Sequence, residues 1–303
     1  MTGEALARFL ELRGWKVLEA AGAFWQEFRE RSYMSFPHQV VLSPDPAELD
    51  VLLRSSKALC LRYASAQPHG LGGGLFVVRD KNYGLASVQA RARSKVRRGL
   101  ERCEIRPVDL DLLQRQGLQL NLDTMARQER SEAEFGEAKR WKRLIEAIRQ
   151  SPTISVTGAF VDGRLSAYAI VHREDRWVHL LYQMSRTADL QHYPNYALHY
   201  HVSREIAGAD VEAMCSGPLS LIEGGGLRDF KLRMGMEVLP QTFAFRFHPA
   251  VSRMAASSLA GTVAEGLRRL RPKNTRLEVL ANVLRGARLS RPPVNGTGEV
   301  APC

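Results

Sequence analysis

Apolar runs rich in β-forming residues predict three β-strands in the second half of the chain. The first two cover residues 156–161 and 164–171, which are rich in β-branched and aromatic side chains. Asp162 and Gly163 join them, and this pair tolerates the positive φ angles of a two-residue hairpin turn. Residues 177–184 form the third run. The pattern therefore predicts an antiparallel hairpin followed by a third strand.

A helix is predicted to follow these strands. Pro194 suits its first turn, and apolar residues then recur at helical spacing: Tyr196, Ala197, Tyr200, Val202 and Ile206. A further strand ends near Met214, and a closing helix covers residues 227–234. Strands and helices in this order predict an α+β fold.

The first half of the chain is interpreted as a mixture of helices and strands. Residues 4–13, 20–30 and 109–130 are predicted to be helical. Asp45 and Pro46 mark the start of another helix, because aspartate can cap a helix and proline suits its first turn.

A glycine-rich run at residues 67–74 separates two predicted strands at residues 57–63 and 75–79. A phosphate cradle normally leads from a strand directly into the start of a helix. This run leads into another strand, so a hairpin loop is the preferred interpretation.

Residues 85–103 are predicted to form a helix with one apolar stripe and otherwise basic faces. Seven basic residues lie in this helix or just after it: Arg91, Arg93, Lys95, Arg97, Arg98, Arg102 and Arg106. They form either a solvated surface or a contact for phosphate groups. The net charge of +11 favours phosphate-rich partners such as coenzyme A, tRNA, other nucleic acid or anionic lipid.

Four segments are expected along the chain, with a boundary near residues 150–152 at the end of a helix over residues 135–149. They are an N-terminal α+β lobe at 1–150, a core at 151–248, a helical extension at 249–289 and a disordered tail at 290–303. The extension contains amphipathic helices at 249–270 and 277–289, which pack on the core or lie on an anionic membrane.

Composition limits the class of protein further. A chain of 303 residues can bury a sizeable core. It contains no apolar run of about 18 residues, and charged residues interrupt its first thirty, so a cytoplasmic protein is predicted. Its four cysteines lie far apart, which argues against a zinc site or a disulfide framework. The motifs of serine hydrolases, P-loop proteins and zinc peptidases are absent from the sequence.

Three stretches carry a resemblance to a known family: residues 160–168, residues 193–200, and Phe230-Lys231 followed by Gly235. Their order between residues 153 and 247 resembles the GNAT superfamily of N-acyltransferases, in its Fem-type or BioF2-like branch. The resemblance implies an α+β fold with a GNAT-like mixed sheet flanked by helices, one or two GNAT-like lobes, and a helical C-terminal extension. The first lobe would be a degenerate GNAT-like half.

The sequence departs from the family at one motif. GNAT enzymes usually follow the third strand with a phosphate loop of the form Gln/Arg-x-x-Gly-x-Gly/Ala. Residues 185–194 contain no glycine. This departure bears directly on binding of the coenzyme A pyrophosphate.

The resemblance implies an N-acyltransferase that moves an acyl group from acyl-coenzyme A, its co-substrate, to an amine without a metal ion. Some relatives use aminoacyl-tRNA, so a second hypothesis is tRNA-dependent transfer to a peptidoglycan precursor. A third is a non-catalytic binding module. The expected partners are a small-molecule or peptide amine acceptor, tRNA and an anionic membrane surface, and the oligomeric state stays open.

Candidate site residues follow from their positions in this scheme. Glu223 is the first candidate for the base that deprotonates the amine, and Tyr196 is a second catalytic candidate. Donor contacts are assigned to Gln183, Ser185, Arg186, Tyr193, Asn195 and Lys231. Acceptor contacts are assigned to the polar helix end that carries Thr124, Arg127 and Gln128. For each residue the alternative is a capping, packing or solvated surface role.

Overall fold

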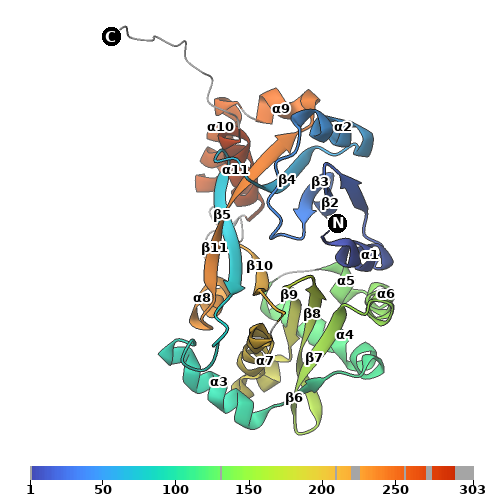
Figure 1. Ribbon diagram of the computed structural model, residues 1–303, viewed down its shortest axis with the longest axis vertical. Helices are drawn as coiled ribbons and strands as arrows, with labels where there is room; N and C mark the ends of the chain where they lie inside the picture. The colour runs from blue at the N-terminus through green and yellow to red at the C-terminus, as the bar shows by residue number, and fades with distance from the viewer. Residues whose placement is uncertain are drawn as a thin grey trace. The chain divides into compact units, whose positions relative to one another are not determined.

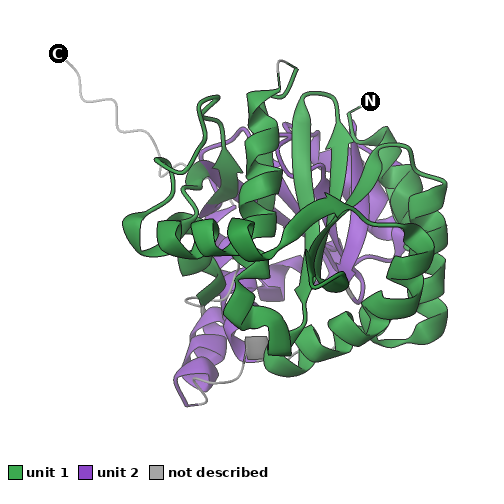
Figure 2. Ribbon diagram, turned by 90° about the horizontal axis from the view of Figure 1, so that it is seen from below, with its two compact units in different colours: residues 1–18, 74–219, 224–239 green, residues 19–73, 220–223, 240–303 purple. Residues whose placement is uncertain are grey.

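The computed structural model describes residues 2–129, 132–208, 210–219, 226–255, 257–270 and 275–290 (Figure 1). The chain divides into two compact units whose segments interleave along the sequence (Figure 2). Unit 1 comprises Met1–Leu18, Gly74–Leu219 and Gly224–Leu239, and unit 2 comprises Glu19–Gly73, Ser220–Glu223 and Pro240–Cys303. No boundary between the units falls at residues 150–152.

Unit 1 contains a mixed sheet with the strand order β5-β10-β9-β8-β7-β6. These strands are β5 (Leu71–Val78), β6 (Glu104–Pro107), β7 (Ile154–Val161), β8 (Arg164–Glu174), β9 (Trp177–Ser185) and β10 (Ala213–Pro218). Neighbouring strands pair antiparallel except β9 and β10, which run parallel. Asp162 and Gly163 have φ angles of 49° and 75°, so the predicted hairpin turn is confirmed.

Helices cover both faces of this sheet (Figure 1). Ala167, Ala169 and Val171 share a core with residues of α7 (Pro194–Ser203) and α3 (Ala90–Arg102). The intervening Tyr168 points to the opposite face, where it packs against Trp141 of α6 (Ala138–Arg149). That face also carries α1 (Glu4–Leu12), α4 (Leu110–Arg127) and the short α5 (Ala133–Gly136). The helix predicted from Pro194 is therefore confirmed, and the helix predicted over residues 85–103 is confirmed from Ala90 to Arg102, whereas residues 85–89 precede it.

The basic helix α3 packs closely against α7 because Gly99 lies at their contact. A Cβ atom at this position would lie 2.7 Å from the carbonyl oxygen of Tyr193 and 3.1 Å from the Cβ of Ala197. The absence of a side chain at Gly99 lets the two backbones approach. The start of α7 is thereby held beside the basic helix.

Unit 2 contains the strand order β1-β2-β3-β4-β11. The strands are β1 (Val17–Ala20), β2 (Ala23–Arg29), β3 (Ser32–Phe36), β4 (Cys60–Ser65) and β11 (Glu237–Phe247). Three strands, β1, β5 and β11, begin in one unit and end in the other. Helix α2 (Pro46–Ser56) begins as predicted, because the Asp45 carboxylate accepts the backbone N–H of Ala47 at 2.9 Å.

Two predictions for unit 2 are wrong. Residues 20–30 form strands rather than a helix, since Ala21 and Gly22 adopt positive φ angles and turn the chain between β1 and β2. The glycine run continues into β5 rather than forming a loop throughout. A Cβ atom on Gly73 would lie 2.6 Å from the Phe243 ring, so glycine permits close approach of β11.

The C-terminal helices are α9 (Pro249–Ala255), α10 (Ser258–Leu270) and α11 (Thr275–Leu289). The single helix predicted over residues 249–270 is divided, and the Ser257 hydroxyl accepts the Ala260 N–H at 3.1 Å at the start of α10. Residues 291–303 of the predicted disordered tail lie outside the described residues, whereas Ser290 follows α11 and bonds to Gly286. Among the described helices, none is both long enough and apolar enough to cross a membrane.

We expect Gly99→Ala to lower the free energy of unfolding. Crowding against Tyr193 should cost about 1–3 kcal/mol, which exceeds the roughly 1 kcal/mol that alanine contributes in a helix interior. Urea unfolding provides the measurement. Ser94→Ala on the exposed part of the same helix is the control and should be neutral or slightly stabilising; equal stability of the two variants would contradict the close packing.

Candidate functional site

The parallel strands β9 and β10 pair only over their first residues. Ala213, Met214 and Cys215 align with Trp177, Val178 and His179. Strand β10 then shifts its register, and Pro218 aligns with Leu75 of β5. Strand β9 continues to Ser185 along β8, with an irregularity opposite Ile170 and Val171. Because bulges often lie beside active sites and ligands bind at the carboxyl ends of parallel strands, this region is the candidate site.

The end of β9 is held by a side chain from α4. The Thr124 hydroxyl donates to the Ser185 carbonyl at 2.8 Å and accepts the Ser185 N–H at 2.9 Å. Both residues are buried. Arg127, one turn later, donates to the Ser185 hydroxyl at 2.9 Å and to its carbonyl at 3.3 Å. The side chains of Thr124 and Arg127 therefore take the place of a neighbouring strand at Ser185.

Helix α7 joins the same network through Asn195. The Asn195 amide donates to the Ser185 hydroxyl at 2.9 Å. Its side-chain oxygen accepts the Gln183 amide at 3.0 Å, and the Gln183 amide also reaches the Asn195 carbonyl at 3.1 Å. The network thus connects α4, β9 and α7.

A carboxylate lies at the start of the segment that follows β9. Asp123 accepts the Thr187 N–H and the Thr187 hydroxyl, each at 2.6 Å, where the 3-10 helix η1 (Thr187–His192) begins. Burial acts to raise the pKa of Asp123, but the Thr187 hydrogen bonds and the charges of Arg127 and Arg186 outweigh it and lower that pKa. The negatively charged Asp123 carboxylate therefore already binds the N–H and hydroxyl of Thr187, the first residue of this segment.

The start of α7 offers few backbone donors to a phosphate group. Pro194 has no N–H, and Tyr193 adopts a left-handed conformation with φ of 58°. The N–H groups of Tyr196 and Ala197 both donate to the Tyr193 carbonyl, at 3.0 and 3.2 Å. In a GNAT phosphate loop these positions would supply anion-binding donors.

Lys231 lies on α8 (Gly226–Arg233), beside β10 and β5. Its side chain is buried and its ammonium group donates to the Ser216 carbonyl of β10. The amine also lies over the Phe76 ring, 4.7 Å from the ring centroid. Of the three N–H groups of a lysine, one is bound to Ser216.

Phe230, which precedes Lys231 on α8, packs against side chains of α7. The Phe230 ring contacts Tyr196 and His199 of α7 at centroid distances of 5.1 and 5.2 Å. Lys95 of α3 lies over the Tyr196 ring, 5.3 Å from its centroid. Phe230 and Tyr196 thus link α8 to α7 and, through Lys95, to the basic helix.

Burial shifts the pKa values of this cluster. It lowers the pKa of Lys231 to about 8, against a small opposing effect of Cys215. Burial and then the Lys231 charge lower the pKa of His199 to about 3, so this imidazole is neutral. Burial raises the pKa of the Cys215 thiol to about 11. Lys231 is the group of this cluster whose proton can move near neutral pH.

The structure brings most of the predicted site residues into these two clusters. Thr124, Arg127, Gln183, Ser185 and Asn195 form one network, although sequence positions assigned them to separate donor and acceptor sites. Tyr196 and Lys231 belong to the second cluster. The exposed Gln128 ends α4, and Tyr193 and Arg186 flank η1. Glu223 lies outside the described residues.

Sequence reasoning missed three participants. Asp123, Phe76 and His199 carry no local motif. A carboxylate one residue before Thr124 on a polar helix end was the available indication of Asp123. Among the described residues, no group of three or more His, Cys, Asp or Glu side chains is placed to hold a metal ion.

No family model matches the chain, and no curated protein matches its sequence. Solved structures share its fold. The structure of FemX is 12% identical and covers 89% of this chain and 94% of its own, with a TM-score of 0.57. The C-terminal domain of a putative lysylphosphatidylglycerol synthetase from Agrobacterium fabrum is 15% identical and covers 79% of this chain and 86% of its own, with a TM-score of 0.53.

L-PGS from Bacillus licheniformis is 12% identical and covers 90% of this chain and 97% of its own, again with a TM-score of 0.53. At these identities the likeness establishes the fold. The chain shares the α+β fold of FemX, with a large mixed sheet flanked by helices, and the predicted α+β fold class is confirmed.

We expect Thr124→Val to destabilise unit 1 by about 1–3 kcal/mol. Valine keeps the shape of threonine but leaves the buried Ser185 N–H without its acceptor. Thr124→Ser keeps the hydroxyl and should retain more of the stability. Chemical denaturation of both variants checks this, and equal losses would show that the methyl group, not the hydroxyl, matters.

Lys231 should make stability depend on alkaline pH. Its pKa falls from 10.5 in the unfolded chain to about 8 in the fold, so between these values the unfolded state binds more protons. Stability from this group therefore rises with pH across that window, by up to about 3 kcal/mol. The stability of the wild type relative to Lys231→Met should rise accordingly between pH 8 and pH 10.5.

Exposed Lys142 on α6 supplies the control for this titration. The stability difference between the wild type and Lys142→Met should stay flat over the same range. A flat difference for Lys231→Met as well would exclude a depressed pKa at Lys231.

Proposed function

We propose that the protein is an acyltransferase that joins an acyl group to an amine, with Lys231 beside the reacting carbonyl. The observation that carries the proposal is the buried Lys231 amine, held by the Ser216 carbonyl where β10 leaves β9. Burying a charged amine without a carboxylate partner costs folding free energy, and among the described residues no carboxylate is paired with Lys231. Such buried titratable groups are often found at functional sites. The GNAT fold supports transfer chemistry as a class.

The chemistry needs a donor for a developing negative charge. When the amine nitrogen attacks the acyl carbonyl, a new C–N bond forms and the carbonyl oxygen becomes an oxyanion. The intermediate collapses by breaking the bond to the carrier, and the proton lost by the amine leaves with the carrier oxygen or sulfur. The Lys231 ammonium retains donors that can hold the oxyanion, and its pKa of about 8 lets it relay a proton.

The surroundings of α7 favour aminoacyl-tRNA over acyl-coenzyme A as the carrier. The Asp123 carboxylate accepts the Thr187 N–H, and the Tyr193 carbonyl accepts the N–H groups of Tyr196 and Ala197. These backbone N–H groups are therefore not free to bind a pyrophosphate. The adjacent α3 instead exposes four arginines without an ion-pair partner among the described residues: Arg91, Arg97, Arg98 and Arg102. Such a row suits the extended phosphate backbone of RNA.

The acceptor in this proposal is an amine, of which a peptidoglycan precursor is one example. Acyl-coenzyme A as donor is the competing hypothesis and predicts saturable binding of acetyl-coenzyme A. A non-catalytic module predicts binding without transfer. These alternatives are separated by measuring binding and transfer on the same protein.

We expect tRNA to bind with a strong salt dependence, and acetyl-coenzyme A not to saturate the protein. Filter binding of aminoacylated tRNA at several salt concentrations measures the first. Arg97→Gln and Arg98→Gln should each weaken binding and reduce the slope of log K against log salt by about one. Arg253→Gln, which changes an exposed arginine of unit 2, is the matched control.

Transfer is tested with tRNA carrying radiolabelled amino acids and a panel of primary amines. Lys231→Met should bind tRNA normally but transfer about 100- to 1000-fold more slowly, as expected for loss of one oxyanion donor. Lys142→Met should behave like the wild type. Equal transfer by Lys231→Met would overturn the role of Lys231, and one-site binding of acetyl-coenzyme A would overturn the choice of carrier.

A further inference from the structure

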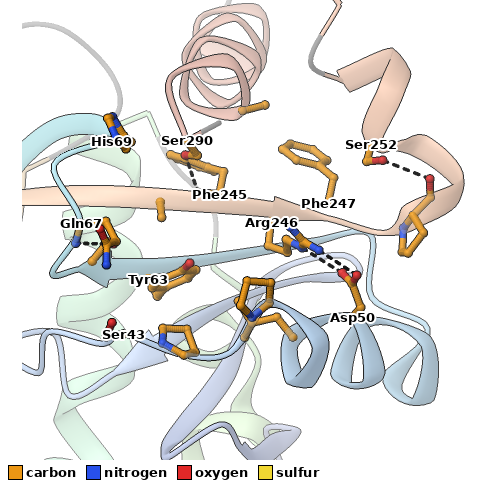
Figure 3. Close-up of a pocket in the computed structure, with 17 residues that line it drawn as sticks. Ser43, Asp50, Tyr63, Gln67, His69, Phe245, Arg246, Phe247, Ser252 and Ser290 are labelled. Atoms are coloured by element: carbon orange, nitrogen blue, oxygen red, sulfur yellow. Dashed lines mark hydrogen bonds and ion pairs between the residues drawn. The ribbon is translucent and has the colours of Figure 1, made fainter. Parts of the chain in front are cut away.

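Unit 2 contains a cavity of about 510 Å³ that the proposed transfer does not use. Its walls come from the loop before α2, from β4, from the end of β11 and from the C-terminal helices (Figure 3). Cavities of this size hold small organic molecules. All the residues that line the cavity belong to unit 2.

The cavity exists because β11 extends beyond its partner β5. Strand β5 begins at Leu71, and Gly70 lies against the Phe243 carbonyl, so the following residues of β11 lack β5 on that edge. The Phe245 N–H on this edge donates to the Ser290 hydroxyl at 2.9 Å instead of to a strand. The Ser290 hydroxyl therefore satisfies the Phe245 N–H, and the cavity lies beside this hydrogen bond.

Arg246 provides an anion-binding group on the cavity wall. Its Nε and Nη2 atoms donate to the two Asp50 oxygens at 2.8 and 2.7 Å (Figure 3). A guanidinium has five N–H groups in a planar fork, so three remain. The remaining Nη1 and Nη2 hydrogens lie at the end of the fork, where they can bind a second carboxylate or phosphate in a bidentate manner.

Tyr63 adds a second donor next to Arg246. It lines the same cavity, and the Arg246 charge acts on its hydroxyl. The ring is fixed edge-on against Trp25 at a centroid distance of 6.0 Å. Within the described ranges the Tyr63 hydroxyl has no hydrogen-bond partner, so it is available to a ligand.

The charges around this site permit an anion. Both oxygens of Asp50 are occupied by Arg246, and Arg54 and His248 lie close enough to Asp50 to lower its pKa further. A second wall, from the loop before α2 and the start of α2, includes the apolar Pro44, Pro46 and Leu49. A ligand with one anionic end and one apolar or ring-shaped end fits both walls.

We propose that unit 2 has a binding site for a small organic anion, a carboxylate or phosphate monoester, held by Arg246 and Tyr63 with its apolar part against the prolines. The site is independent of the acyl transfer proposed for unit 1. Carboxylates and phosphate monoesters share the bidentate geometry that the guanidinium recognises, and the experiment distinguishes them.

The test is calorimetric titration of the full chain at about 150 mM salt, where surface attraction is screened. The probes are benzoate, phenyl phosphate and the neutral benzyl alcohol. We expect one-to-one binding of at least one anion and at least tenfold weaker binding of benzyl alcohol. No saturable binding of either anion up to about 10 mM, or equal binding of benzyl alcohol, would overturn the proposal.

Two variants locate the bound anion. Tyr63→Phe removes only the hydroxyl and should weaken binding about tenfold, because a hydrogen bond to a charged group is lost. Arg246→Lys keeps a positive charge for Asp50 but loses the fork, and should weaken binding at least as much. Arg253→Lys on α9 is the matched control and should bind within twofold of the wild type.

Thermal unfolding without ligand shows whether each variant folds. Tyr63→Phe deletes no protein hydrogen bond of the described residues, so it should unfold like the wild type and carries the test if Arg246→Lys does not fold. Unchanged anion affinity in folded Tyr63→Phe and Arg246→Lys would place the anion elsewhere and overturn the proposed site.

Discussion

The early end of pairing between β9 and β10 is the constraint on which the rest of unit 1 depends. Buried backbone N–H and C=O groups have to be paired, and β9 runs on without β10 after His179. At Ser185 the hydroxyl of Thr124 pairs with both backbone groups. Arg127 and Asn195 then bind the Ser185 hydroxyl, so α4 and α7 are positioned by the need to complete one strand.

The same divergence of strands creates the environment of Lys231. The register of β10 against β5 shifts between Cys215 and Pro218, and the Ser216 carbonyl in this irregular stretch accepts the Lys231 ammonium. Desolvation then brings the pKa of Lys231 to about 8 and leaves His199 neutral. The lowered pKa of Lys231 therefore results from burial rather than from a charged partner.

Local features of unit 1 could be predicted because their causes are local. The turn at Asp162-Gly163 and the helix start at Pro194 each depend on the conformations that a few residues allow. Residues 20–30 were wrongly predicted to be helical because their apolar residues fit both the helical and the strand repeat. The turn at Gly22, which has a positive φ angle, separates two strands instead. The division of residues 249–270 into two helices likewise depends on a local contact, because the Ser257 hydroxyl caps the start of α10 by accepting the Ala260 N–H.

The candidate site could be predicted only as separate residues. Thr124 and Ser185 are far apart in the sequence, and nothing local in either indicates that they meet. The absence of glycine at residues 185–194 was visible in the sequence, but the Asp123 carboxylate that accepts the Thr187 N–H and hydroxyl was not. Because the Thr187 donors already bind a carboxylate, they are not free to bind a pyrophosphate. The exposed arginines of α3, in contrast, attract any polyanion. In the proposed function, the side chains of α3 rather than backbone donors would bind phosphate groups, and this is the physical reason for proposing RNA over coenzyme A as the carrier.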